Sequence, residues 1–198
     1  MRVIGGEFRS RRLRTLEGRA TRPTSDRLRE TLFNVLGGEL TGKRFVDAYA
    51  GSGAVGIEAL SRGAAQAVFI ENDAVAAEVI RENLKALGIG SRGVVVRKPA
   101  VTALAQMMGD IVFLDPPYSD VTEYEAVLSL LGRKPPALVI AEHARRAELK
   151  DTYGRLERVR VLHQGSSSLS LYQPGGVTKL VVNGSLQRLG AGRSSLTS

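Results

Sequence analysis

The chain has 198 residues, of which 43 % are hydrophobic and 24 % charged, a composition typical of a globular domain with a sizeable core. No apolar run approaches the roughly 20 residues of a membrane-spanning helix, and arginines interrupt the start of the chain where a secretory signal would lie. The absence of cysteine excludes disulfides, thiolate metal sites and cysteine nucleophiles, and we expect a cytoplasmic protein.

The formal net charge of +8 is concentrated at the start of the chain. Residues 1–29 contain nine arginines and only three acidic side chains, whereas the rest of the chain is nearly balanced. Because guanidinium groups bind phosphate through two parallel hydrogen bonds, this block predicts contact with a nucleic acid, with Arg9, Arg11 and Arg12 as candidates. The alternative interpretation is a solvated basic face that only favours solubility.

Residues 1–40 are expected to form a basic segment ahead of the main domain. The stretch "RVIGGEFRSRRLRTL" alternates weakly in hydropathy and contains Gly5-Gly6 as a turn, which predicts a short hairpin. A helix follows, capped by Thr24 or Ser25 and ended by Gly37-Gly38. Its apolar stripe consists of Leu28, Leu32, Val35 and Leu36.

Residues 41–174 alternate between predicted strands and helices and form the expected main domain. Strands are predicted at 44–48, 67–71, 93–97, 110–115 and 137–143, followed by an antiparallel pair near 155–165 and 168–173. On the helix predicted at 73–88, Val75, Val79 and Leu87 are expected to face inward. Helices between buried apolar strands predict an α/β fold with a doubly wound, mostly parallel sheet. Residues 175–198 are rich in Gly and Ser and are expected to form a flexible tail.

The stretch "AYAGSGAVGIEAL" places Gly51, Gly53 and Gly56 in the spacing G-x-G-x-x-G directly after the first strand. In an open α/β sheet, ligands bind beyond the carboxyl ends of the strands, where glycines let the backbone approach them closely. Glu71 ends the next strand, where its carboxylate can accept both hydroxyls of a ribose. These residues fit NAD and S-adenosylmethionine equally well.

Asp47 favours S-adenosylmethionine over NAD. A carboxylate four residues ahead of Gly51 would repel a pyrophosphate, whereas it would attract the ammonium and sulfonium groups of S-adenosylmethionine. The alternative interpretation is a carboxylate that only binds backbone amides of the glycine loop.

The stretch "DIVFLDPPYSD" delivers Asp115, Pro116, Pro117 and Tyr118 to the same edge of the sheet. An exocyclic base amine is a poor nucleophile, but Asp115 and the Pro116 carbonyl can accept its two N–H bonds and aim the nitrogen at a sulfonium methyl group. The prolines fix the direction of that carbonyl, and Tyr118 offers a ring on which an unstacked base can lie. Alternatively, the prolines only end the strand and Tyr118 only packs.

Together these residues resemble the RsmD family of bacterial 16S ribosomal RNA guanine-N2 methyltransferases. The similarity runs from "RVIGG" and "RPTSDRLRETLFN", the stretches most particular to this family, through the glycine loop and "DPPY" to about Pro174. The resemblance implies a Rossmann-like class I methyltransferase with seven strands, S-adenosylmethionine as donor, and 16S ribosomal RNA or the assembling small subunit as partner. We further expect a monomer, and no metal site, because His143 and His163 lie far apart in sequence without ligand-spaced partners.

The resemblance also implies site residues. Those for the cofactor are Asp47, Tyr49, Ala50, Gly51, Ser52, Gly53, Glu71, Asn72, Pro99, Ala100 and Asp115. In the family the N-terminal segment helps to hold the RNA and closes over the site, so the candidates here are Arg22, Pro23, Thr24, Ser25, Asp26 and Arg27. Ser25 and Asp26 could instead be plain helix-capping residues.

This sequence departs from the family at two cofactor positions. Pro99 stands where the family usually has an acid that meets the adenine amine, and Asn72 replaces a usually apolar residue that packs on the adenine. Cofactor affinity could therefore be lower, or the adenine could be held by backbone and Ala100. Three other functions stay open: an amino-methyltransferase acting on DNA adenine or another RNA base, an NAD-dependent oxidoreductase, and an RNA-binding protein without catalysis.

Overall fold

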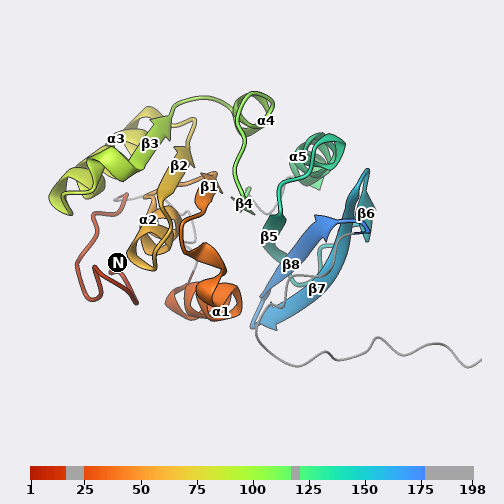
Figure 1. Ribbon diagram of the computed structural model, residues 1–198, viewed down its shortest axis with the longest axis horizontal. Coiled ribbons are helices and arrows are strands. Elements are labelled where there is room, and N and C mark those ends of the chain that lie inside the picture. The colour runs from red at the N-terminus through yellow and green to blue at the C-terminus, as the bar shows by residue number, and fades with distance from the viewer. Residues whose placement is uncertain (17–24, 117–120, 177–198) are drawn as a thin grey trace, which may run out of the picture.

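The computed structural model describes residues 1–16, 25–116 and 121–176, and their strands form one eight-stranded sheet in the order β3-β2-β1-β4-β5-β8-β7-β6 (Figure 1). The first five strands run parallel to one another, while β8, β7 and β6 continue the sheet in antiparallel pairs. The bounds are β1 Arg44–Ala48, β2 Gln66–Ile70, β3 Gly93–Val96, β4 Ile111–Leu114, β5 Leu138–Ala144, β6 Thr152–Tyr153, β7 Leu156–Gln164 and β8 Ser167–Pro174.

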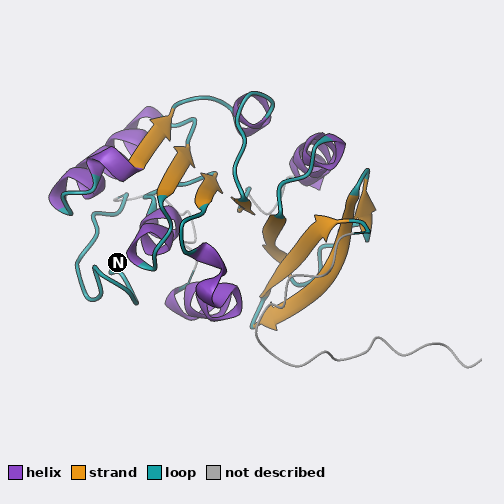
Figure 2. Cartoon of the chain, viewed as in Figure 1, coloured by secondary structure: helices purple, strands orange, loops and turns teal. Residues whose placement is uncertain are grey.

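The helices cover both faces of this sheet, which confirms the doubly wound α/β prediction (Figures 1 and 2). Buried side chains of α1, α2 and α3 pack on one face, and those of α4 and α5 on the other. The bounds are α1 Asp26–Leu36, α2 Ala54–Ser61, α3 Ala74–Ala86, α4 Ala100–Leu104 and α5 Val121–Arg133, with 3-10 turns η1 Gly37–Leu40 and η2 Gly90–Arg92. Across the described ranges, no helix combines the length and apolarity needed to cross a bilayer.

The strand count of seven was wrong by one, because β6 adds a two-residue pair at the edge of the sheet. Thr152 and Tyr153 pair with Glu157 and Leu156 across the tight turn at Gly154. Two residues are too few to display the alternation from which a strand is predicted.

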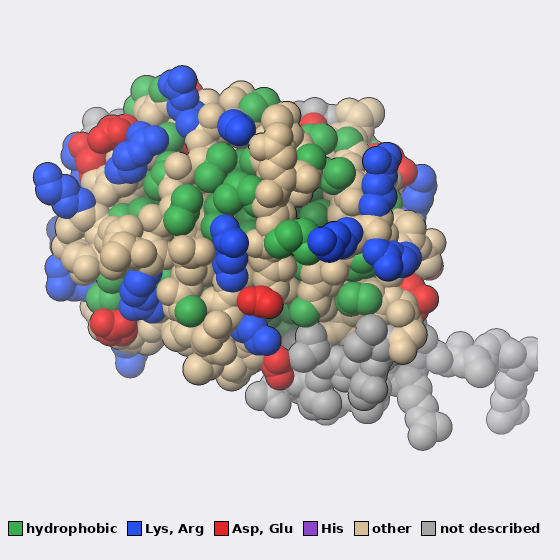
Figure 3. All heavy atoms as spheres, turned by 45° about the horizontal axis from the view of Figure 1, so that its top comes forward, with side chains coloured by type: hydrophobic (Ala, Val, Ile, Leu, Met, Phe, Trp, Pro, Cys, Tyr) green, Lys and Arg blue, Asp and Glu red, His purple; other side chains and the backbone are tan. Residues whose placement is uncertain are grey.

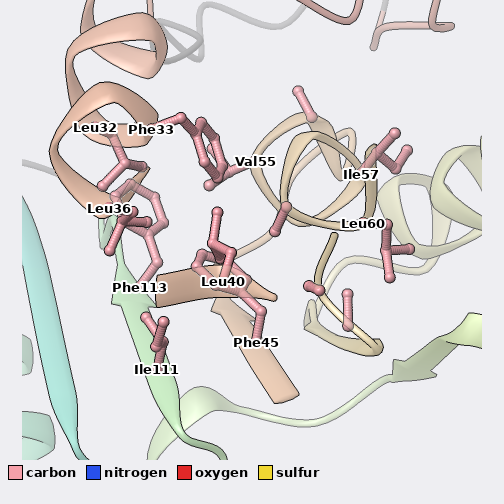
Figure 4. Packing of buried hydrophobic residues seen from close by; sticks show 14 of the residues in the cluster. Leu32, Phe33, Leu36, Leu40, Phe45, Val55, Ile57, Leu60, Ile111 and Phe113 are labelled. Atoms are coloured by element: carbon pink, nitrogen blue, oxygen red, sulfur yellow. The ribbon is translucent and has the colours of Figure 1, made fainter. Parts of the chain in front are cut away.

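Helix α1 follows its prediction closely. The Leu28 amide donates to the Ser25 hydroxyl (3.2 Å), which caps the helix, and Gly37 ends it at a φ of 50°. The predicted stripe is buried, and Leu32, Phe33 and Leu36 point toward Phe45 of β1 and Phe113 of β4 in Figure 4. Burial of each such side chain stabilises the fold by about 1.5–3 kcal/mol. Helix α1 and the central strands therefore share one core.

The inward face predicted for α3 was wrong at Val75, which is 62 % exposed, and only partly right at Val79, which is half-buried. Leu87 packs against the core as expected. The face that is buried consists of Ala76, Ala77, Ile80, Asn83 and Leu84. These buried residues recur with the period of an α-helix and form one face of α3. Val75 lies just outside that face, and an apolar side chain alone does not show that its position is buried.

The two ends of the segment 1–16 lie antiparallel to each other. The hairpin predicted there does not turn tightly at Gly5-Gly6. Arg2 and Arg12 form a single bridge, and the chain reverses through residues 5–10. Gly6 has a φ of +77°, and a Cβ there would lie 1.9 Å from the Ser61 carbonyl oxygen. The glycine is therefore required for the close approach of this segment to α2.

Candidate active site

The parallel register brings the carboxyl ends of β1, β2 and β4 to one edge of the sheet. Asp47 of β1 pairs with Phe69 of β2 on one side and Phe113 of β4 on the other. The glycine loop, Glu71 and Asp115 each follow one of these strands. The structure thus gathers at one edge the side chains that the sequence assigns to a single site.

The three glycines of the loop have three different physical roles. Gly51 has a φ of +55°, and an added Cβ would meet no atom of the described chain within 4 Å, so the space above it is open. Gly53 begins α2 with a φ of +78°. At Gly56 a Cβ would lie 2.3 Å from the Phe69 ring, so this glycine allows α2 to pack closely on β2. An open, glycine-lined cradle before a helix fits a nucleoside cofactor.

The neighbouring loop residues are fixed by three other elements. The Ala50 amide donates to the Ile70 carbonyl (3.0 Å). Tyr49 has a φ of 68°, and its hydroxyl donates to the Glu123 carboxylate of α5 (2.6 Å). Asn83 of α3 donates to the Ser52 carbonyl (3.1 Å). The loop is therefore pre-formed by contacts with β2, α3 and α5.

Asp47 is 2 % exposed and its carboxylate accepts the Gly56 amide hydrogen (2.8 Å). The pKa of this carboxyl is raised to about 8, mainly by burial and to a smaller extent by the charge of Glu71, while the Gly56 hydrogen bond opposes the shift. Asp47 therefore binds a backbone amide of the glycine motif, which both interpretations of this residue allow. Its attraction for the cofactor ammonium stays a prediction.

Glu71 is held at the sheet edge by two backbone amides. Gly51 donates to one carboxylate oxygen and Asp73 to the other, each at 2.8 Å. Asp73 in turn caps α3, because the Ala76 amide donates to its side chain (2.9 Å). Glu71 therefore lies directly beside the glycine loop, where the ribose of a nucleoside is expected.

The two positions that depart from the family pattern lie at the same edge. Asn72 is exposed directly after Glu71. Pro99 is exposed at the start of α4 and gives its first amides no side-chain hydrogen bond, while Ala100 is 5 % exposed. Position 99 therefore offers no side-chain acceptor to an adenine amine, and adenine binding through the backbone and Ala100 stays a prediction.

Asp115 and Pro116 follow β4, with Asp115 half-buried and Pro116 buried. Their predicted companions Pro117 and Tyr118 lie outside the described residues. Tyr124 of α5 is buried beneath this strand end, and its hydroxyl lies 3.5 Å from the Pro116 carbonyl oxygen. The strand end that carries Asp115 is therefore supported by α5.

The structure describes some of the residues predicted to contact RNA but not all of them. Arg9, Arg11, Arg12, Ser25 and Arg27 are exposed, as a surface for RNA requires. Asp26 pairs with the buried Arg29 (2.7 Å), which supports a structural role for it. Arg22, Pro23 and Thr24 lie outside the described residues. On the face shown in Figure 3, Lys and Arg side chains lie mainly around a central group of hydrophobic side chains.

Sequence reasoning missed three residues that organise the site. Glu58 of α2 is fully buried and accepts the amide hydrogens of Ile4 (2.7 Å) and Gly5 (2.8 Å). Asn83 accepts the Arg14 amide hydrogen (2.8 Å) in addition to its contact with the glycine loop. Glu142, which is 2 % exposed, lies near the carboxyl end of β5. For Glu58 and Glu142 the available signal was a single acid within an apolar helix or strand.

On this fold, the open glycine cradle, Glu71 beside it and Asp115-Pro116 at the adjacent strand end define a class I S-adenosylmethionine-dependent methyltransferase. A family model described as Conserved hypothetical protein 95 matches residues 1–173. The chain belongs to this family, the RsmD family that its motifs resemble.

Two relatives carry names that state an activity. YlbH of Bacillus subtilis, provisionally named an rRNA methyltransferase, is 36 % identical over 185 residues, which cover 89 % of this chain and 100 % of YlbH. Ribosomal RNA small subunit methyltransferase D of Escherichia coli is 44 % identical over 120 residues, 60 % of each chain.

Solved structures agree on the fold. The Escherichia coli protein yhhF, provisionally named a methyltransferase, superimposes with a TM-score of 0.77 at 36 % identity, covering 88 % of this chain and 97 % of yhhF. An RNA methyltransferase from Salinibacter ruber, in complex with S-adenosyl-L-homocysteine, gives a TM-score of 0.61 at 16 % identity, covering 79 % and 97 %. The latter likeness shows the fold alone.

Proposed function

We propose that this protein transfers the methyl group of S-adenosylmethionine to the exocyclic N2 amine of a guanine in small-subunit ribosomal RNA. The observation that carries the proposal is the position of Asp115-Pro116, at the end of β4 and beside the glycine loop, in a chain of the RsmD family. The names of the relatives support ribosomal RNA as the substrate class.

The residues around the loop would hold the cofactor. Glu71 would accept the ribose hydroxyls, the backbone at Ala100 would meet the adenine, and Asp47 in its ionised form would attract the ammonium group. Bound S-adenosylmethionine supplies a methyl group on a sulfonium, which is open to in-line displacement. The open space over Gly51 allows the backbone to approach such a ligand closely.

Asp115 and Pro116 would orient the acceptor. The lone pair of a guanine N2 amine is delocalised into the ring, so the amine needs positioning more than it needs a strong base. The Asp115 carboxylate and the Pro116 carbonyl would each accept one N–H bond and direct the nitrogen at the methyl carbon. The positive charge that forms on nitrogen is relieved when one of these protons passes to the Asp115 carboxylate or to water.

The test uses methyl-labelled S-adenosylmethionine and small ribosomal subunits that lack the modification, followed by digestion of the RNA and identification of the labelled nucleoside. We expect label in N2-methylguanosine, and a loss of about 100-fold or more in Asp115→Ala because a group that orients the transition state is removed. Asp151→Ala is the matched control, since the Asp151 side chain is 82 % exposed.

The remaining outcomes separate the other functions. Label in another nucleoside would point to a different amino-methyltransferase. Thermal stabilisation by NAD but not by S-adenosylhomocysteine would indicate an oxidoreductase. RNA binding without cofactor binding would indicate a protein that has lost catalysis.

A further inference from the structure

A cavity of about 200 Å³ lies between the start of α1, the carboxyl end of β5 and the turn that joins β7 to β8. Helix α1 contributes Ser25 and Arg27, β5 contributes Glu142, and the turn contributes residues 164–167. The function proposed above assigns no role to this cavity or to Glu142. It is smaller than the roughly 300–1,000 Å³ clefts that hold drug-sized molecules, which suits a single nucleobase.

Glu142 lies next to the strand end that carries Asp115. Leu114 of β4 pairs with Ala141 of β5, so the following residues, Asp115 and Glu142, are neighbours across the two parallel strands. The buried Tyr124 hydroxyl donates to the Glu142 main-chain carbonyl (2.7 Å) and also lies 3.5 Å from the Pro116 carbonyl oxygen. One buried side chain thus lies against both strand ends.

The side chain of Glu142 belongs to the face of the sheet that α1 covers. Alternate residues of a strand share a face, and Ile140, two residues earlier, packs in the core with α1. Leu169, which pairs with Glu142 across β8, lies in the same core. The carboxylate therefore reaches the cavity from a site that is 2 % exposed.

The hydrogen-bonding groups of the Glu142 side chain match the Watson–Crick edge of guanine. Guanine presents N1–H and the N2 amine as adjacent donors, and the carboxyl oxygens of Glu142 are hydrogen-bond acceptors. Neighbouring strands lie about 4.8 Å apart, so two carboxylates on adjacent strand ends can serve two adjacent donors. Adenine presents an acceptor at N1, which a buried carboxylate would oppose at a cost of desolvation.

We propose that this cavity receives the target guanine and that Glu142 accepts the N1–H of its Watson–Crick edge while Asp115 and Pro116 hold the N2 amine. Glu142 is then the residue that determines specificity for guanine. The exposed Arg27 guanidinium lies at the cavity with the hydroxyls of Ser166 and Ser167, where the phosphate of the same nucleotide can bind. This inference rests on the proposed function.

The test compares guanosine with 2,6-diaminopurine at the modified position. Diaminopurine keeps the N2 amine but has an acceptor at N1. Once the labelled nucleoside has been located in the RNA, ligated RNAs carrying either base are assembled into small subunits. Wild type, Glu142→Gln and the exposed control Glu148→Gln are assayed for methyl transfer.

We expect wild type and Glu148→Gln to methylate guanosine at least 100-fold faster than diaminopurine. In Glu142→Gln the amide can donate to N1, so the preference should fall by 10-fold or more, with S-adenosylhomocysteine binding unchanged. A ratio of rates does not depend on the fraction of the variant that folds.

Two results would overturn the inference while leaving the proposed function intact. One is a wild-type enzyme that methylates both bases at similar rates. The other is a Glu142→Gln variant that loses activity on both bases equally, which indicates a structural role only. Failure of wild type to methylate guanosine would instead contradict the proposed function itself.

Discussion

Asp47 of β1 and Glu71 after β2 both lie next to the glycine loop, yet their environments differ. Asp47 is buried and receives one amide hydrogen bond, whereas Glu71 is half-buried and receives two. Desolvation favours the protonated form of a carboxyl, and hydrogen bonds to its ionised form oppose that effect. Burial is the largest influence on the pKa of Asp47, so proton binding at this residue should affect the stability of the fold.

Asp47→Asn should flatten the dependence of stability on pH. The pKa of Asp47 is raised from 3.8 to about 8 in the folded protein, so the folded state binds the proton more tightly than the unfolded chain. Stability from this group is present below about pH 4 and is lost as the pH rises through about 8. Asn removes the ionisation and keeps an oxygen for the Gly56 amide.

The measurement is thermal unfolding of the cofactor-free protein from about pH 5 to pH 9. The Tm of Asp47→Asn minus that of wild type should increase with pH, and the exposed variant Glu148→Gln, measured alongside, controls for the loss of a surface carboxylate. Parallel profiles for Asp47→Asn and wild type would show that Asp47 is ionised throughout this range.

Gly56→Ala should destabilise the protein through overpacking. The new Cβ would lie 2.3 Å from the Phe69 ring, which is itself fully buried, so neither α2 nor β2 can move without a cost. We expect a loss of about 1–3 kcal/mol in the free energy of unfolding, measured with urea. Gly38→Ala is the control, since no atom of the described chain lies within 4 Å of its added Cβ. An unchanged midpoint for Gly56→Ala would contradict the packing role.

At the scale of secondary-structure elements, the sequence predicted the helices and strands whose pattern lies within their own residues. The alternation of buried apolar strands with helices located β1 to β5, and the Ser25 cap with its apolar stripe located α1. The N-terminal segment was harder, because its path depends on Glu58 and Ser61, which lie more than 50 residues away in sequence. Glu142 was missed because its neighbour Asp115 lies on another strand, and only the register brings the two together.

Glu58→Gln should loosen the N-terminal segment from α2. The buried carboxylate accepts hydrogen bonds from Ile4, Gly5 and the Arg62 guanidinium, and an amide has only one accepting oxygen. We expect faster hydrogen exchange at the Ile4 and Gly5 amides and a loss of about 1–3 kcal/mol in stability. Glu82→Gln, which breaks an exposed pair with Arg14, should cost less than about 1 kcal/mol. Equal effects of the two variants would contradict the anchoring role of Glu58.

At the scale of the whole molecule, the basic N-terminal segment and the methyltransferase sheet are physically joined. Val3 and Leu13 are buried in the same core cluster as Phe45 and Phe113. Asn83 binds both Arg14 and the Ser52 carbonyl of the glycine loop. The basic surface predicted to bind RNA is therefore held in a fixed relation to the loop predicted to bind the cofactor.

This arrangement predicts how salt should affect RNA binding. Arg9, Arg11 and Arg12 are exposed on the segment, and each phosphate contact to single-stranded RNA contributes about 0.7 to the slope of log K against log salt. If each arginine contacts one phosphate, the triple alanine variant should reduce that slope by roughly 2. The measurement is a titration of small-subunit RNA at several salt concentrations.

The control is a second triple variant, Arg133→Ala, Lys134→Ala and Arg155→Ala, whose exposed side chains lie near the amino end of β5 and away from the site. It removes the same formal charge, so a general loss of attraction would lower both slopes alike. A lower slope in the first variant only would locate the phosphate contacts on residues 9–12. Equal slopes in both would mean that these arginines act only through the net charge of +8.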